Sequence, residues 1–412
     1  MRIAFVLGIF PALSETFILN QITGLIDRGH EVDIYAGHPS PTSKVHSDVI
    51  KYELLKRTCY KTQMPKNRLL RLLKAVGLIL VNLHKNPIAL LHSLNVFKYG
   101  KQAASLNLLY STIPLLSRKK PYDIIHCHFG AVGILGAYFR EIGVLRGKLI
   151  TTFHGGDVNV VTAVEGTDFY KSLFAKCDLY TINSTFTAGK AIALGCPRDK
   201  IVKLPVGVNL AKYCFKERRA TIGGAIRILT VARLVEKKGI EFSVRAVAKA
   251  MKDYPNLEYN IVGDGPLRES IEMLIGQLGI SNKVNLHDWC NQEEIRNLYS
   301  EAHIFVLASV TAANGDKEGQ GLVLQEAQAS GLPIISTLHN GIPEGVLNGR
   351  SGFLVPERDV EALAEKLVYL IRHPEIWPEM GRAGRAFVEE HYDINKLNNR
   401  LVEIYRELLL DL

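Results

Sequence analysis

The segment Glu318-Gly-Gln-Gly-Leu-Val-Leu-Gln-Glu326 stands between two short apolar runs, at 303–307 and 333–336. The runs predict buried strands, and apolar positions from Leu322 to Leu332 predict a short buried helix that ends near Gly331. A strand, a glycine-bearing loop, a helix and a second strand form the repeating unit of a parallel α/β sheet. This segment therefore predicts the fold class of the chain around it.

The same segment also predicts a ligand site. Gly319 and Gly321 have no Cβ, so a ligand can approach their backbone closely. The free N–H groups at the start of the helix favour an anion such as a diphosphate. Glu318 on the loop and Glu326 about one turn inside the helix can both accept hydrogen bonds from hydroxyl groups, which describes a receptor for a nucleotide sugar. The alternative is two unrelated glutamates on a solvated helix.

The alternation of strand and helix continues on both sides of this unit. In the second half, further strands are predicted near 226–231, 257–262, 283–287 and 352–355, and helices near 239–252, 266–278, 292–300, 321–330, 359–371, 375–390 and 394–411. In the first half, strands are predicted near 2–8, 31–36, 122–127, 148–153, 178–182 and 200–204, and helices near 15–28, 131–142, 168–176 and 185–194. We therefore expect an α/β protein of two Rossmann-like, doubly wound parallel-sheet domains that face a central cleft.

A chain of 412 residues is long for one core, which also favours two domains. We place an N-terminal domain at 1–209, a polar, glycine-bearing linker at 210–225 and a C-terminal domain at 226–390. A final helix is predicted over 391–412. Whether it crosses back to the N-terminal domain is an open alternative. The first strand lacks a GxGxxG turn, so a dinucleotide cofactor on the N-terminal domain is not expected.

Positive charge is concentrated in a helical insert at about 51–120. This insert holds 14 Lys and Arg residues and one acid, Glu53, whereas the whole chain has a net charge of +9. Basic and apolar residues alternate from Lys66 to Lys85 in a basic amphipathic helical pattern, which is suited to an anionic membrane surface. A solvated basic face and nucleic-acid binding are the alternatives, although no nucleic-acid-binding motif is present.

Cysteine and hydrophobic patterning exclude some other classes. The six cysteines form no CxxC pair, which is typical of a reducing compartment. His126-Cys127-His128 could suggest a metal site, but on a strand Cys127 would face away from both histidines. The apolar N-terminus from Ile3 to Phe10 is better explained as a buried strand than as a signal peptide, and no apolar run is long enough to span a membrane.

Three more segments of the second half follow predicted strands and suit phosphate binding. Arg233 and Lys238 follow strand 226–231 and can balance a diphosphate, Arg as a planar fork and Lys as a point charge. Gly263-Asp-Gly-Pro266 forms a tight turn after strand 257–262. A polar loop, Ser309 to Asp316, precedes Glu318.

These motifs together resemble the retaining GT-B glycosyltransferases of glycosyltransferase family 4. The resemblance rests on Ala-Arg233-Leu-x3-Lys238-Gly, Val-Gly263-Asp-Gly-Pro, the Glu318/Glu326 pair, Gly352-Phe-Leu-Val-Pro356, Leu204-Pro-Val-Gly-Val-Asn209 and Thr152-Phe-His154-Gly-Gly-Asp157. It covers nearly the whole chain. The runs Phe10-Pro-Ala-Leu-Ser-Glu-Thr-Phe17 and Ser309 to Asp316 resemble the colanic-acid and amylovoran type of exopolysaccharide glycosyltransferase.

The resemblance implies roles for particular residues. Glu326 would hold the ribose hydroxyls and Glu318 the hydroxyls of the transferred hexose. Arg233 and Lys238 would balance the diphosphate leaving group in place of a metal, so no metal or cofactor is expected. The remaining donor contacts would come from Gly263 and from the amides of Gly319, Gln320, Gly321, Leu322 and Val323. Many relatives have an aromatic residue where this chain has Gln320, and this difference bears on donor choice.

The resemblance also places residues on the acceptor side. His154 matches the family's histidine near the reacting centre, with a core or capping histidine as the alternative. Asp157 would orient His154 or bind the acceptor. Ser14, Glu15 and Thr16 replace a glycine pair of many relatives and are candidate acceptor contacts, with an N-cap at Ser14 as the alternative.

The reaction expected from the resemblance is transfer of a hexose from a nucleotide diphosphate, with uridine favoured over guanosine, and with retention of configuration. No protein nucleophile is evident, which favours front-face attack assisted by the departing phosphate. The acceptor would be a glycan or lipid-linked oligosaccharide of exopolysaccharide or lipopolysaccharide biosynthesis, at the cytoplasmic face of the membrane. The alternatives are a GT-B sugar-nucleotide epimerase and a non-catalytic, basic peripheral-membrane protein.

Overall fold

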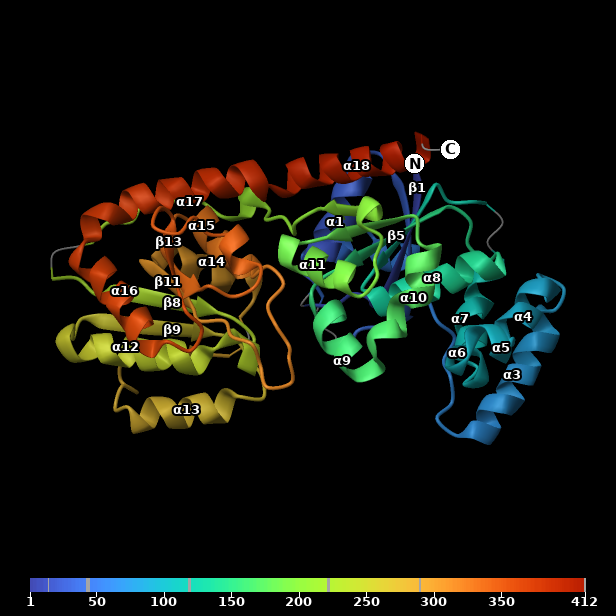
Figure 1. Ribbon diagram of the computed structural model, residues 1–412, viewed down its shortest axis with the longest axis horizontal. Coiled ribbons are helices and arrows are strands. Elements are labelled where there is room, and N and C mark those ends of the chain that lie inside the picture. Colours follow the sequence, from blue (N-terminus) through green and yellow to red (C-terminus); the bar gives the residue numbers. More distant parts are fainter. Residues whose placement is uncertain (14, 42–44, 118–119, 221–222, 289, 411–412) are drawn as a thin grey trace.

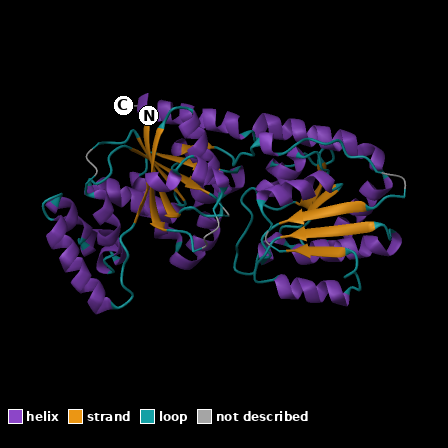
Figure 2. Cartoon of the chain, turned by 180° about the vertical axis from the view of Figure 1, so that it is seen from behind, coloured by secondary structure: helices purple, strands orange, loops and turns teal. Residues whose placement is uncertain are grey.

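Two parallel sheets, each covered by helices, make up the computed structural model (Figures 1 and 2), which describes residues 1–13, 15–41, 45–117, 120–220, 223–288 and 290–410. The first sheet has the order β3-β2-β1-β4-β5-β6-β7 and the second the order β10-β9-β8-β11-β12-β13. The two doubly wound sheets confirm the predicted fold class.

The strands of the first sheet are β1 (Arg2–Ile9), β2 (Glu31–His38), β3 (Thr58–Tyr60), β4 (Ile124–His128), β5 (Lys148–Phe153), β6 (Leu179–Ile182) and β7 (Ile201–Lys203). Those of the second sheet are β8 (Ile226–Val231), β9 (Leu257–Val262), β10 (Val284–His287), β11 (Ile304–Leu307), β12 (Ile334–Thr337) and β13 (Gly352–Val355). The central strands are buried on both faces, which explains their continuous apolar runs. The sequence did not predict β3, which is only three residues long.

Each sheet reverses its winding at one place. The chain passes from β1 outward to β2 and β3 and then returns to β4 on the other side of β1. It does the same from β8 to β9 and β10 before returning to β11. Ligands of such sheets bind where the winding reverses, beyond the carboxyl ends of the strands. These positions are therefore the loops after β1 and β4 in the first sheet and after β8 and β11 in the second.

The helices of the first half are α1 (Thr16–Asp27), α2 (Ser47–Lys51), α3 (Arg68–Asn82), α4 (Pro87–Ser93), α5 (Val96–Tyr99), α6 (Lys101–Ala104), α7 (Asn107–Thr112), α8 (Gly130–Ile142), α9 (Thr162–Glu165), α10 (Lys171–Lys176) and α11 (Thr185–Ala193). Those of the second half are α12 (Ile240–Asp253), α13 (Arg268–Gln277), α14 (Gln292–Glu301), α15 (Leu322–Ala329), α16 (Val360–Arg372), α17 (Trp377–His391) and α18 (Ile394–Leu410). The helix predicted over 168–176 is shorter than expected, because a 3₁₀ turn (Thr167–Tyr170) precedes α10. None of the described helices is both long and apolar enough to cross a bilayer.

The last helix connects the two sheets. In Figure 1, α17 and α18 run along the top of the molecule, from the second sheet to the first. Leu401, Ile404 and Tyr405 of α18 are buried in the same core as β1 and α1. Arg28, at the end of α1, donates hydrogen bonds to the carbonyl of Asn395 (2.8 Å) and to the side chain of Asn399 (2.7 Å). The chain therefore returns to the first sheet at its end.

Candidate functional site

The loop before α15 is held from behind by a buried histidine. The backbone N–H of Glu318 donates to Nε2 of His339 (3.0 Å), and Nδ1 of His339 lies 2.6 Å from the Glu357 carboxylate. Because Nε2 accepts, Nδ1 carries the proton and donates to Glu357. Glu357 in turn accepts from the N–H of Thr311 (2.7 Å). These contacts hold the loop in place. Sequence pattern does not predict them, because the residues lie far apart along the chain.

Glu318 and Lys238 form a largely buried ion pair. Burial opposes ionisation of Glu318, but the charges of Lys238 and Lys237 and the hydrogen bond from Lys238 outweigh it and lower the Glu318 pKa to about 2. The carboxylate is therefore ionised at neutral pH. The sequence predicted that both residues serve the same ligand, but not that they bind each other in its absence.

Glu326 lies in a different environment. Burial raises its pKa to about 7, against the opposing effect of hydrogen bonds from Tyr213 and Tyr299. The hydroxyl of Tyr299 lies 3.2 Å from its carboxylate. Glu326 lines a cleft whose opposite wall is Thr16 and Asn20 of the first half. A half-buried carboxylate at the edge of such a cleft is suited to accept hydrogen bonds from ligand hydroxyls.

Arg233 follows β8 at the point where the winding of the second sheet reverses. Its side chain is exposed and has no hydrogen bond or ion pair with any described residue. Gly263 follows β9 in the neighbouring loop with φ +145°, and a Cβ there would collide with the carbonyl of Ala232. The glycine thus lets the two loops meet, and the guanidinium remains free for an anion.

Gln320 has its side chain turned away from the predicted ligand position. It is 5% exposed and forms two hydrogen bonds with the backbone of Val206, from the Val206 N–H (2.7 Å) and to the Val206 carbonyl (2.8 Å). The side chain therefore joins residues 318–321, here called the donor loop, to the segment after β7. The predicted contacts of Gln320 with a donor are therefore left to its backbone. Gly321 occupies the N-cap of α15 with φ +79°, and Leu322 and Val323 begin the helix.

His154 follows β5 and faces the donor loop from the first sheet. The residue is half-buried, and desolvation of the ring lowers its pKa to about 3, so the ring is neutral at physiological pH. Asp157 accepts from the backbone N–H of His154 and from that of Gly130, each at 2.8 Å. Both carboxylate oxygens are thus occupied, and Asp157 is 4% exposed. Of the two predicted roles, this geometry favours positioning of the His154 loop over contact with an acceptor.

A column of histidines lies behind His154, and the sequence analysis missed it. Nε2 of His154 lies 3.0 Å from Nδ1 of His128, and the rings of His128 and His126 stack at 4.6 Å. His126 ends the column with hydrogen bonds to the hydroxyls of Thr152 and Tyr405, both 2.6 Å long. Cys127 faces the other side of the sheet, toward Gly136, as predicted. The one sequence feature that could have indicated the column is that His126 and His128 are alternate residues of β4 and therefore share a face of the sheet.

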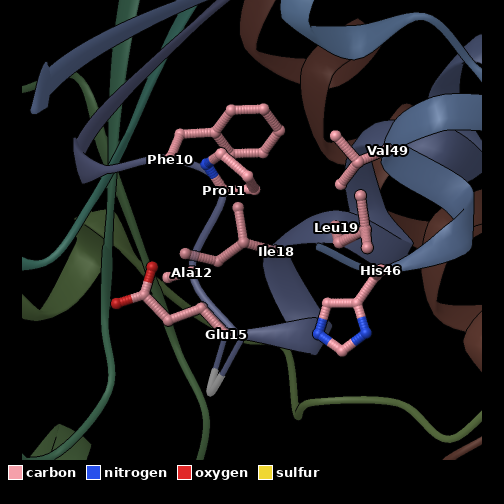
Figure 3. Close-up of a pocket in the computed structure, with 8 residues that line it drawn as sticks. All are labelled: Phe10, Pro11, Ala12, Glu15, Ile18, Leu19, His46 and Val49. Atoms are coloured by element: carbon pink, nitrogen blue, oxygen red, sulfur yellow. The ribbon is translucent and has the colours of Figure 1, made fainter. Parts of the chain in front are cut away.

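Two of the predicted acceptor residues, Glu15 and Thr16, lie at the start of α1. Glu15 lines a small pocket with Phe10, Pro11 and His46 (Figure 3), and burial raises its pKa to about 7. Thr16 lines the cleft that contains Glu326. Ser14 lies outside the described residues. Glu15 takes the N-cap position without a side-chain capping bond.

The two halves meet directly at Gly319. A Cβ at this position would lie 2.6 Å from the carbonyl oxygen of His154 and 2.9 Å from the Asn183 side chain. A third contact lies nearby, where Glu344 of the second half accepts from the N–H of Thr185 at the start of α11 (2.8 Å). The donor loop of the second half therefore packs directly against His154 and lies near the N-terminus of α11, and we call this contact the junction.

We expect Gly319→Ala to destabilise this junction by about 1–3 kcal/mol, because the added methyl group has no space. A matched control is Gly156→Ala, two residues after His154. An ideal Cβ there has no neighbour within 4 Å, and the backbone φ of −56° suits alanine. Thermal unfolding should show a lower midpoint for Gly319→Ala and an unchanged one for Gly156→Ala. Equal midpoints for both variants would contradict the proposed contact.

Comparisons with known proteins identify the family of the chain. The family model for glycosyl transferases group 1 matches residues 215–387, and that for Glycosyltransferase Family 4 matches residues 14–212. The amylovoran biosynthesis glycosyltransferase AmsK of Erwinia amylovora is 36% identical over 99% of this chain and 100% of its own length. WcaL of Salmonella typhimurium, assigned to colanic acid biosynthesis, is 35% identical over the same shares.

Solved structures with the same fold are also known. HepE of Anabaena, solved in complex with UDP and glucose, superimposes with a TM-score of 0.70 at 16% identity, covering 99% of this chain and 100% of HepE. At this identity the likeness concerns the fold alone. The sequence matches decide the family: the chain belongs to glycosyltransferase family 4 and is a glycosyltransferase with the GT-B fold.

Proposed function

We propose that the protein transfers a hexose from a nucleotide diphosphate sugar to a hydroxyl group of a glycan or lipid-linked oligosaccharide, with retention of the anomeric configuration. The observation that carries the proposal is the placement of two half-buried carboxylates, one just before α15 and one inside it. Glu318 is held ionised beside Lys238, and Glu326 lies at the edge of the cleft. The exposed Arg233 adds a free cation for a diphosphate.

The donor assignment takes further support from the relatives. HepE was solved with UDP and glucose, which supports a uridine diphosphate hexose as donor. AmsK and WcaL are assigned to amylovoran and colanic acid biosynthesis, which supports an acceptor in exopolysaccharide assembly. We expect Glu326 to hold the ribose, Glu318 the hexose, and Lys238 and Arg233 the phosphates, without a metal ion.

Retention is proposed to proceed by front-face attack. The acceptor oxygen bonds to the anomeric carbon as the bond from that carbon to the diphosphate breaks, and the acceptor proton passes to the departing phosphate oxygen. Two carboxylates of the site support this route, because Glu318 is paired with Lys238 and Asp157 accepts from two backbone N–H groups. A trapped covalent glycosyl-enzyme would contradict it.

Calorimetric titration with a panel of nucleotide sugars, in the presence of a chelator, tests the donor site. We expect one donor to bind wild type and to lose at least tenfold in affinity in Glu326→Ala, because the carboxylate hydrogen bonds to the ribose hydroxyls are lost. The control is Glu269→Ala on α13, an exposed glutamate without a hydrogen bond to any described residue. Equal affinities for wild type and Glu326→Ala would contradict the assignment.

A sugar-nucleotide epimerase is the alternative within the same fold. It would consume the nucleotide sugar and release free nucleotide without an acceptor. We expect free nucleotide to accumulate in step with glycosylated acceptor when a membrane extract supplies acceptors. Rapid, stoichiometric release of nucleotide without any extract would favour the epimerase.

A further inference from the structure

The helix α3 has its apolar side turned away from the protein. Its inward face is formed by Ala75 and Asn82, which are buried, and by residues that are half-buried. Its outward face, here called the leucine face, consists of Leu69, Leu73, Val76 and Leu80. These four residues recur at intervals of four, three and four positions and are 49–68% exposed. A surface helix of a soluble protein normally shows the opposite arrangement.

The neighbouring surface is apolar as well. Leu70, Leu72 and Val81 flank the leucine face on α3 and are more than half exposed. Ile88 and Leu91 of α4 are also exposed, and so is Phe97 of α5. In Figures 1 and 2 these helices lie at the end of the molecule farthest from the second sheet. An apolar surface of this extent usually marks a contact with a partner or a membrane.

The charge around this surface identifies the partner. The chain has no acidic residue between Glu53 and Asp123. Lys66, Arg68, Lys85 and Lys101 are exposed, and none of them forms a side-chain hydrogen bond or ion pair with the described part of the chain. Such cations are attracted by the negative surface of a bilayer that contains anionic lipids.

We propose that the leucine face and these four cations dock on an anionic phospholipid bilayer. Apolar side chains enter the boundary between headgroups and acyl chains while the cations contact lipid phosphates, which is the binding mode of interfacial helices. Nucleic acid would satisfy the cations but leave the leucines in water. A second copy of this chain would bring two strongly basic surfaces together, which opposes dimerisation through this face.

The docking surface is independent of the sugar-donor site, because none of its residues lies among those that surround Glu318 or Glu326. Where the acceptor is carried by a lipid, docking would bring the cleft and its acceptor to the same membrane surface. A failure of the membrane proposal would therefore leave donor binding untouched, and the converse also holds.

Flotation with vesicles of phosphatidylglycerol and phosphatidylethanolamine tests the proposal. One variant replaces Leu69, Leu73 and Leu80 by Ser, and a second replaces the four cations by Glu. Control variants change exposed positions elsewhere: Met273→Ser with Val164→Ser, and Glu at Lys252, Arg350, Lys396 and Arg406. Calorimetric donor binding and the thermal midpoint confirm that each variant is folded.

We expect wild type to float with anionic vesicles, and each docking variant to lose at least tenfold in vesicle partitioning while the controls retain it. Binding of wild type should weaken strongly in phosphatidylcholine vesicles and at high salt. Unchanged partitioning of folded docking variants would overturn the proposal. It would also be overturned if sedimentation showed a wild-type dimer that the leucine variant abolishes, since a second copy would then cover this face.

Discussion

Replacement of Lys238 by Met is expected to lower kcat by about 10²- to 10³-fold, the scale of losing one preorganised charge at a transition state. Lys238 lies in a largely buried ion pair with Glu318, at the loop where the winding of the second sheet reverses. Under the proposed function, its ammonium balances the negative charge that builds on the leaving diphosphate. The free Arg233 cannot replace it, because its side chain is exposed to solvent and therefore acts through a higher dielectric.

The adjacent Lys237 provides a matched control. It is also a largely buried lysine, but it pairs with Asp316 in the loop after β11 (3.0 Å). Steady-state kinetics of Lys237→Met should show a loss of less than tenfold. Lys238→Met also leaves Glu318 unpaired, so the double variant Lys238→Met with Glu318→Gln should stay inactive although it removes the unpaired charge. Recovery of activity in that double variant would show that Lys238 serves only to neutralise Glu318.

Local sequence pattern predicted most of the architecture. Strands β8, β9 and β13 were predicted with their observed bounds, because a buried parallel strand is a continuous apolar run that ends at a turn signal. The edge strand β3 was missed, since three half-buried residues give no such run. The π-helical turn Asp157–Val161 was missed as well, because nothing in its composition separates it from a loop.

Tertiary contacts of the site were less predictable than its residues. Motifs indicated Lys238 and Glu318 individually, but their pairing depends on how two loops meet across β8 and β11. The prediction for Gln320 concerned its backbone amide, and the contact of its side chain with Val206, 114 positions away, was not foreseen. His339 could not be found from the sequence, because its contact with Glu318 arises only after the chain folds. Sequence motifs thus identify functional residues that lie within one segment, but they do not predict contacts between residues of different segments.

Glu326→Gln is expected to stabilise the protein above pH 7 and to weaken donor binding. Burial raises the pKa of Glu326 from its ordinary 4.5 to about 7. Below pH 4.5 the carboxyl is protonated in both the folded and the unfolded chain, so it has no effect on stability. Between 4.5 and about 7 the unfolded chain releases this proton first, so stability falls as pH rises. The accumulated loss is about 3 kcal/mol above pH 7.

Glutamine cannot ionise, so the substitution removes this loss while its amide oxygen can still accept from Tyr299. Urea unfolding at pH 8 should therefore show Glu326→Gln more stable than wild type, and at pH 4.5 the two should nearly coincide. The control Glu269→Gln, on the exposed surface of α13, should follow wild type at both pH values. A variant less stable than wild type at pH 8 would mean that the carboxylate is compensated in the folded protein. We expect higher stability together with weaker donor binding, because the Glu326 carboxylate serves ligand binding while it lowers the stability of the folded protein.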